Sequence, residues 1–166
     1  MYRVEQPELW GYTSHQDWVT MQMLGSHCTN CHAAITYIPL KEFQDSHPEY
    51  FALNASGKRV HSSMGKNVQT HYCMNNQELI RLAASRLAEM MKADPEAKYF
   101  YFFPGDGGDY YCKCAECRKL GSTTDRLLYW IDSIAKITGK QYPDRILVTL
   151  AYTDSQTPPE KIRNLS

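Results

Sequence analysis

The sequence predicts an α/β protein built from βαβ units around a parallel sheet, and three segments of the C-terminal half carry this prediction. The aromatic run Tyr99–Phe103 has the length of a strand, and its lack of alternation indicates a strand covered on both faces, as in a parallel sheet. Residues 122–139 have the apolar spacing of a helix, and residues 146–151 are a second apolar run of strand length. A strand, a helix and a strand in this order form a βαβ unit.

The helix of this unit has a recognisable start and end. Ser122 and Asp125 resemble the two partners of a capping box, and Gly139 stands where a helix typically ends. Between them, apolar residues recur at helical spacing: Leu127, Trp130, Ile131, Ile134 and Ala135. Pro143-Asp144 then interrupts the chain before the second strand.

The alternation of helices and strands continues towards the N-terminus. Asn76 predicts the start of a helix that ends near Asp94 and leads into the strand at Tyr99. Ala33–Ile38 has the composition of a strand, and residues 9–24 that of a further helix. We therefore expect two or three βα units in a single domain spanning residues 1–166.

Composition limits the function. The 166 residues carry 18 basic and 18 acidic side chains, so the electrostatic signature of a nucleic-acid binder is absent and we expect no nucleic-acid partner. No apolar run reaches the roughly 18 residues that cross a bilayer, and the first five residues hold no signal core. The 12 tyrosines suit either a core edge or a wet surface that holds a polar ligand such as a sugar.

A glycine-rich acidic loop, residues 104–109, follows the aromatic strand directly. In parallel α/β sheets ligands bind beyond the carboxyl ends of the strands, where this loop lies. Asp106 or Asp109 could there bind sugar hydroxyls, act as a general acid or base, or hold a metal. The alternative is that both are ordinary turn residues.

Cysteines form the second candidate site. Cys112, Cys114 and Cys117 lie within six residues, too close together to pair with one another without strain. A tetrahedral zinc site needs a fourth ligand, which Cys73 can supply. The pattern leaves three alternatives open: a structural metal, a disulfide between Cys73 and one of the three, or free thiols.

A third motif, Cys28-x-x-Cys31-His32, matches the pattern for covalent haem attachment. The short motif is weak, and an α/β alternation is the wrong context for a small helical cytochrome. A c-type haem protein is therefore the remote alternative.

In combination, several motifs resemble one bacterial family. They are His47–Leu53, Gly57–Arg59, Cys73–Glu78, Asp106 with the three clustered cysteines, Tyr142–Asp144, Ala151-Tyr152 and Pro158-Pro159. Their order and spacing over residues 18–160 resemble the domain-of-unknown-function family 4838 of polysaccharide-degrading bacteria. Thr20, Met21 and Met23 depart from the family, which often has arginines there, and Gln77 stands where proline is common.

This resemblance implies part of a glycoside-hydrolase-like (β/α)8 barrel, similar to those of α-glucuronidases and hexosaminidases. It implies a carbohydrate ligand, glycosidase chemistry if the chain is active, and an exported protein. The ligand face would comprise Asp106 for acid–base work or sugar binding, with His32, His61, Asp109 and Tyr152 as further contacts. The metal site would be structural.

Length separates this chain from a complete barrel. A full barrel needs about 250 residues, so 166 residues supply three or four of eight βα units. An open sheet leaves unpaired edges, which we expect a second copy of the chain or the remaining barrel segments to cover. A non-catalytic binding module, stabilised by a metal or by disulfides, is the alternative function.

Overall fold

The computed structural model describes residues 26–27, 34–59, 70–105 and 111–165, and its centre is a three-stranded parallel sheet. The strands are β1 (Ser26–His27), β2 (Tyr99–Tyr101) and β3 (Ile146–Val148), in the spatial order β1-β2-β3. Tyr99 is in register with Ser26 on one side and with Ile146 on the other. The α/β class with parallel strands is therefore confirmed.

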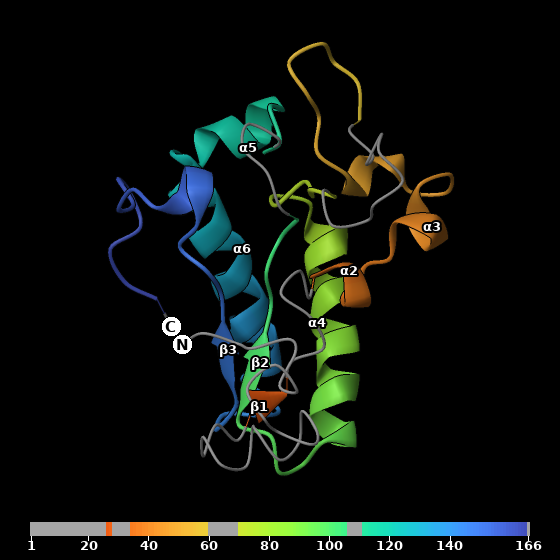
Figure 1. Cartoon of the computed structure of the whole chain (residues 1–166), viewed down its shortest axis with the longest axis vertical. Coiled ribbons are helices and arrows are strands. Elements are labelled where there is room, and N and C mark those ends of the chain that lie inside the picture. The colour runs from red at the N-terminus through yellow and green to blue at the C-terminus, as the bar shows by residue number, and fades with distance from the viewer. Residues whose placement is uncertain (1–25, 28–33, 60–69, 106–110, 166) are drawn as a thin grey trace, which may run out of the picture.

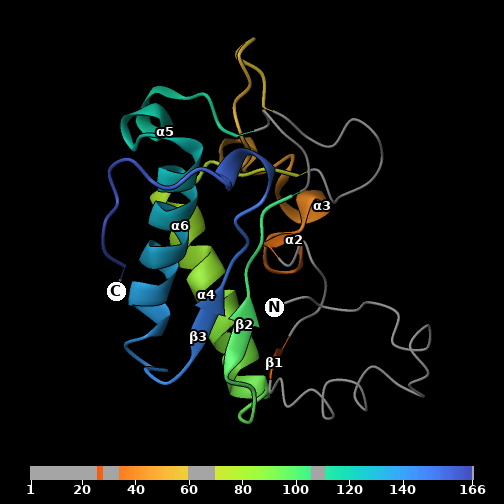
Figure 2. The ribbon, with the colours of Figure 1, turned by 60° about the vertical axis from the view of Figure 1, so that its left-hand side comes forward.

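Two long helices connect the strands and lie on one side of the sheet (Figure 1, Figure 2). Helix α4 (Gln77–Ala93) precedes β2, and helix α6 (Thr123–Thr138) links β2 to β3. The ring of Phe102, directly after β2, meets Trp130 of α6 edge to face at 4.8 Å between centroids. Both side chains are fully buried, so this contact lies in the core between sheet and helices.

Local capping sets the starts of both helices, as the sequence predicts. The Asn76 side chain accepts hydrogen bonds from the backbone N–H groups of Glu78 and Leu79, both at 3.0 Å. Ser122 and Asp125 form the predicted capping box at the start of α6. The ends at Asp94 and Gly139 are also those expected.

The remaining elements are short. They are α2 (Ala34–Tyr37), α3 (Leu40–Phe43), the 3₁₀ turns η2 (Pro48–Tyr50) and η4 (Thr153–Ser155), and α5 (Ala115–Lys119). The stretch from Phe51 to Arg59 folds back on itself through an antiparallel bridge between Leu53 and Arg59, and Phe51 bridges to Tyr72. These pieces gather near the carboxyl ends of β2 and β3 (Figure 1).

Two sequence expectations need correction, and a third is not tested. Ala33–Ile38 is not a strand: residues 34–37 form helix α2, because the buried positions Ala34, Tyr37 and Ile38 have helical spacing. The predicted strands are longer than β2 and β3, which end at Tyr101 and Val148. The helix expected over residues 9–24 lies outside the described residues.

The second strand is also less buried than expected. Ile146 is 42% exposed, and Leu147 and Val148 are half-buried. The cause is position, because β3 is the end strand of this sheet and pairs with β2 alone among the described strands. The sheet is open, so the described part of the chain does not close a barrel. No described helix is both long enough and apolar enough to cross a membrane.

One buried carboxylate joins the start of α6 to the C-terminal segment. Asp125 is fully buried and accepts hydrogen bonds from the N–H and hydroxyl of Ser122, at 2.9 and 2.7 Å. It also accepts backbone N–H bonds from residues 160 to 162, at 3.2, 2.9 and 2.9 Å. Gly121 makes room for this clamp: its φ is +120°, and a Cβ there would lie 2.6 Å from Asp125 Oδ2.

The electrostatics of this clamp make it sensitive to acid. Burial alone would raise the pKa of Asp125, but hydrogen bonds from Ile162, Ser122 and Lys161 outweigh it and hold that pKa below the ordinary value. A carboxylate with a lowered pKa stabilises the fold above the pKa of the unfolded chain, about 3.9. The contribution is lost as the pH falls through the lower pKa of the folded state.

We predict that Asp125→Asn lowers the free energy of unfolding at pH 7 by about 3 kcal/mol. The asparagine NH₂ group would replace one carboxylate oxygen and would face N–H groups whose hydrogen bonds that oxygen now accepts. The variant should also lose the part of the acid sensitivity that Asp125 causes below about pH 5. Denaturant unfolding measured at a series of pH values tests both effects. Glu116→Gln, in an exposed pair with Lys119, is the matched control and should change little. Equal stability of the Asp125 and Glu116 variants would contradict the clamp.

Candidate metal centre and strand-end site

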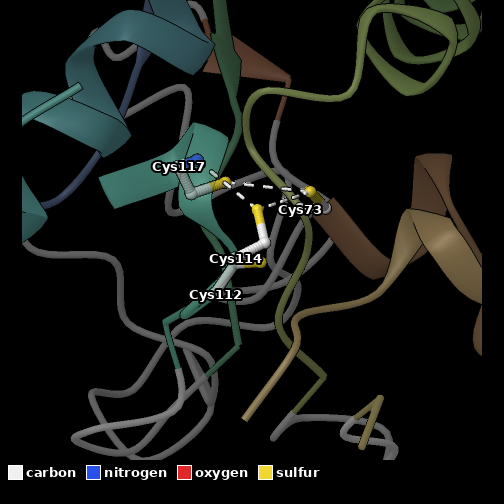
Figure 3. A group of neighbouring side chains, drawn as sticks. All are labelled: Cys73, Cys112, Cys114 and Cys117. Carbon is white, nitrogen blue, oxygen red and sulfur yellow. Dashed lines mark hydrogen bonds between the residues drawn. The ribbon is translucent and has the colours of Figure 1, made fainter. Parts of the chain in front are cut away.

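Four cysteine side chains converge beside the start of α5 (Figure 3). In Figure 1 this helix lies beyond the carboxyl ends of β2 and β3. The sulfur atoms of Cys73, Cys112, Cys114 and Cys117 all lie within 4.8 Å of one another. Cys73 Sγ is 3.8 Å from Cys114 Sγ and 3.7 Å from Cys117 Sγ. Cys73, Cys112 and Cys117 are buried, and Cys114 is half-buried. The fold thus brings together the four cysteines that the sequence predicts as one site.

Local structure places these thiols. Cys114 is the N-cap of α5, and its sulfur accepts a hydrogen bond from the backbone N–H of Cys117 at 3.4 Å. Leu53 donates its backbone N–H to Cys112 Sγ at 3.3 Å. Lys113 in turn donates its N–H to the Leu53 carbonyl, at 2.6 Å. The cluster therefore ties together the folded-back stretch at residue 53, the Cys73 segment and the start of α5.

Hydrogen bonds among the thiols make their acidities unequal. Contacts with Cys117 and Cys73 lower the pKa of Cys112 far below its ordinary value. The contact with Cys112 raises the pKa of Cys73 to about 12, and contacts with Cys112 and Cys73 raise that of Cys117. The thiol of Cys112 is thus the most acidic of these three.

The arrangement has the donor set of a metal site. All four thiols are free, and the separations of 3.7 and 3.8 Å from Cys73 are far longer than an S–S bond of about 2.05 Å. Four sulfurs from one local triplet and one distant residue match the ligand pattern of structural tetrahedral sites. The cluster could hold a metal ion.

Two aromatic side chains next to these ligands form a second feature that the sequence analysis missed. His71 lies two residues before Cys73, and Tyr111 immediately precedes Cys112. Their rings are 5.1 Å apart at 56°, and both side chains are buried. The pKa of Tyr111 is raised above its ordinary value, chiefly by burial. The Asp154 charge adds to this rise, and the Ser155 side chain opposes it. The only signal in the sequence was adjacency to the cysteines.

The 3₁₀ turn η4 follows β3 in the chain. Tyr152 is the N-cap of η4 and is 54% exposed. Its backbone N–H donates to Ser155 Oγ at 3.2 Å, and its carbonyl accepts from the Ser155 N–H at 3.1 Å. Of the predicted ligand-face residues, Tyr152 is therefore placed at the expected end of the sheet. The others, His32, His61, Asp106 and Asp109, lie outside the described residues, as do Cys28 and Cys31 of the haem-like motif.

A further group of potential ligands lies near the start of α4. His47, Glu49 and Glu78 have donor atoms within 4.8 Å of one another. His47 Nδ1 and Glu49 Oε1 are 2.9 Å apart, and the His47 ring stacks on Tyr50 at 4.6 Å. The hydrogen bond and the stacking account for the positions of His47 and Glu49 without a ligand.

Comparisons with known proteins give one match. No curated protein and no solved structure matches the chain. The family model described as "Domain of unknown function (DUF4838)" matches residues 2–165, nearly the whole sequence. This agrees with the resemblance carried by the cysteine, asparagine and proline motifs, and the chain belongs to the DUF4838 family.

Proposed function

We propose that this chain is a carbohydrate-binding domain of the glycoside-hydrolase-like type, in which Zn²⁺ bound by four cysteines holds the strand-end loops together. The observation that carries the proposal is the convergence of Cys73, Cys112, Cys114 and Cys117 at the start of α5. Helix α5 lies beyond the carboxyl ends of the parallel strands (Figure 1). Ligands of parallel α/β sheets bind at that end. The metal would therefore act on the part of the fold that contacts a ligand.

The donor set favours zinc. Four thiolates are the ligands of structural zinc sites, and hard cations such as Mg²⁺ and Ca²⁺ prefer oxygen. Four protein ligands leave no open position for a substrate or a reactive water, so the metal would be structural. The N–H groups of Leu53 and Cys117 that point at sulfur would stabilise the negative charge of the thiolates and orient them.

The cluster also lies where the apolar core does not reach. Ala52, Cys73, Cys112 and Cys117 form a small buried group separate from the main core. Three of these four side chains are thiols, so apolar burial contributes little to holding them. Metal–sulfur bonds would supply the missing stabilisation.

Carbohydrate binding is supported by position and by chemistry. Tyr152 presents an exposed aromatic ring beyond the end of β3, a surface on which a sugar ring can pack. Asp106 and Asp109 follow β2 in the sequence and supply carboxylates for hydroxyl groups. Near the start of this loop, the Gly105 N–H donates to the Thr70 carbonyl at 3.1 Å, and Cys112 lies three residues after Asp109. The loop would therefore be tethered on both flanks.

If the domain also hydrolyses a glycoside, Asp106 would be the acid or base. A second carboxylate would then lie roughly 5–9.5 Å from it. The three described strands bring fewer loops to this end than a closed barrel does, so binding is the activity to test first. A metal-stabilised interaction module without a sugar ligand is the second candidate, which the cysteine cluster alone would support.

We predict that the purified chain contains about one zinc ion per molecule and that Cys114→Ser loses it. The melting temperature should fall in parallel, because the three segments joined at the cluster would separate. Elemental analysis, thiol counting in native and denatured protein, and thermal unfolding measure these effects. Iron with a Soret band would instead indicate haem at the Cys28 motif.

Cys114→His is the matched control for this experiment. Three cysteines and one histidine are an ordinary zinc donor set, so this variant should retain more metal than the serine variant. A wild-type chain that is metal-free, fully stable and insensitive to Cys114→Ser would contradict the metal proposal.

We predict that Asp106→Asn weakens binding to an oligosaccharide panel at least about tenfold without lowering the melting temperature, because a carboxylate hydrogen bond to a ligand hydroxyl contributes about 1.5–3 kcal/mol. The control is Asp144→Asn, the same change at an exposed residue in the turn before β3. Titration calorimetry measures both variants. Unchanged binding by Asp106→Asn would rule out this residue, and no binding by the wild type to any glycan would leave the interaction-module function.

A further inference from the structure

We propose that Cys114 is a site of reversible oxidation, where a hydroperoxide such as hydrogen peroxide joins it to Cys73 in a disulfide. The inference deepens the proposed function, because both sulfurs belong to the four assigned to the metal. Release of the metal rests on that proposed function, whereas formation of the disulfide does not. Two features of the cluster support the inference: the exposure of the sulfurs and the distances between them.

Exposure distinguishes Cys114 from the other three cysteines. Cys73, Cys112 and Cys117 are 7%, 2% and 0% exposed, whereas Cys114 is half-buried. Acidity favours Cys112, but a thiol reacts with a dissolved oxidant only where the oxidant can reach its sulfur. Cys114 is therefore the sulfur of the cluster that a hydroperoxide meets first.

The geometry of the cluster selects the partner of Cys114. Cys73 Sγ lies 3.8 Å from Cys114 Sγ, so an S–S bond of about 2.05 Å requires a movement of roughly 2 Å. Cys117 meets Cys114 differently, because its backbone N–H donates to Cys114 Sγ at 3.4 Å. Cys112 is only two residues away in the sequence, and neighbours this close pair only with strain. Cys73 comes from a distant segment and is free of this constraint.

The reaction balances with the hydroperoxide as the oxidant. The Cys114 sulfur attacks one peroxide oxygen, so that an S–O bond forms, the O–O bond breaks and the other oxygen leaves as water. The Cys73 sulfur then attacks the sulfenic acid at Cys114, forms the S–S bond and displaces a second water. Two electrons pass from the sulfurs to the peroxide. The two protons come from the thiols, or from solvent where the sulfurs are metal-bound thiolates.

This disulfide would replace one link between distant segments with another. It removes two of the four sulfur ligands, so the zinc ion of the proposed site would be released. It also joins positions 41 residues apart, on either side of α4 and β2, and so keeps the Cys73 segment at the start of α5. The oxidised chain thus loses its metal but retains this link, whereas a chelated, reduced chain loses both.

Peroxide treatment of the zinc-loaded full chain tests the proposal. After alkylation of the remaining thiols, cleavage after Lys113 and after Glu116 places the three clustered cysteines in separate peptides. Mass spectrometry then identifies the partner of Cys73, and a zinc-sensitive dye measures released metal. The expected result is a peptide pair linked through Cys73 and Cys114, with about one zinc ion released per disulfide. Dithiothreitol should reverse both changes.

Cys114→Ser and Cys112→Ser are the matched variants, compared after chelation so that both start without metal. Cys112→Ser keeps the reacting pair, so it should form the disulfide and melt at a higher temperature when oxidised than when reduced. In Cys114→Ser, oxidation of Cys73 should be at least about tenfold slower than in the wild type, because the accessible sulfur is gone. The wild-type peptide map is decisive whether or not either variant folds.

Three results would overturn the proposal: peroxide that leaves Cys73 and Cys114 reduced, a disulfide that joins either of them to another cysteine, or unslowed oxidation of Cys73 in Cys114→Ser. A wild type that takes up no zinc but forms the Cys73–Cys114 disulfide would contradict the metal site and support the oxidation site. The two proposals therefore fail separately.

Discussion

The parallel pairing of β2 with β3 is the constraint from which the rest of the described structure follows. In two parallel neighbours both strands run in the same direction, so the chain must return from the end of the first strand to the level where the second begins. Helix α6 provides this connection between β2 and β3. Trp130 fixes this helix against the sheet through Phe102. The carboxyl ends of both strands point to the same side of the molecule. The following segments, which contain α5 and η4, therefore lie close together there (Figure 1).

The two ends of the molecule are held by different chemistry. Around the sheet and the two long helices, large apolar side chains such as Trp130, Phe102 and Leu87 form one continuous core. Beyond the strand ends the buried group is small and consists mostly of thiols. Apolar burial therefore contributes less to stability in this part than in the main core, and the proposed metal would add to it. With the proposed metal bound, such a domain would keep its scaffold while the segments around the cysteines respond to metal supply.

Local patterns made much of the fold predictable. The starts of α4 and α6 follow from Asn76 and from the pair Ser122–Asp125, because a cap acts within one turn of its helix. The cysteine cluster was predictable for the same reason: Cys112, Cys114 and Cys117 are neighbours in the sequence, and a four-ligand site needed one more cysteine. Motif order was also sufficient to identify the family.

Features that depend on distant neighbours were not predictable. Asp125 was expected as a capping residue, but its bonds to residues 160–162 require the chain to return from 35 to 37 positions away. The exposure of Ile146 depends on what lies beside β3, which composition does not state. Helix α2 was mistaken for a strand because a short apolar run has no decisive period. The His71–Tyr111 contact arises only once both cysteine segments have met.

The spacing of the four cysteines also bears on the order of events during folding. Three of them lie within six residues, so this triplet would offer the proposed metal three ligands close together even in the unfolded chain. Cys73 is 44 residues from Cys117, and its arrival closes a loop that contains α4 and β2. The entropy of closing a loop grows only slowly with its length. If the triplet bound the metal first, the arrival of Cys73 would complete the four-ligand site, and the metal would serve as a folding template as well as a structural ligand.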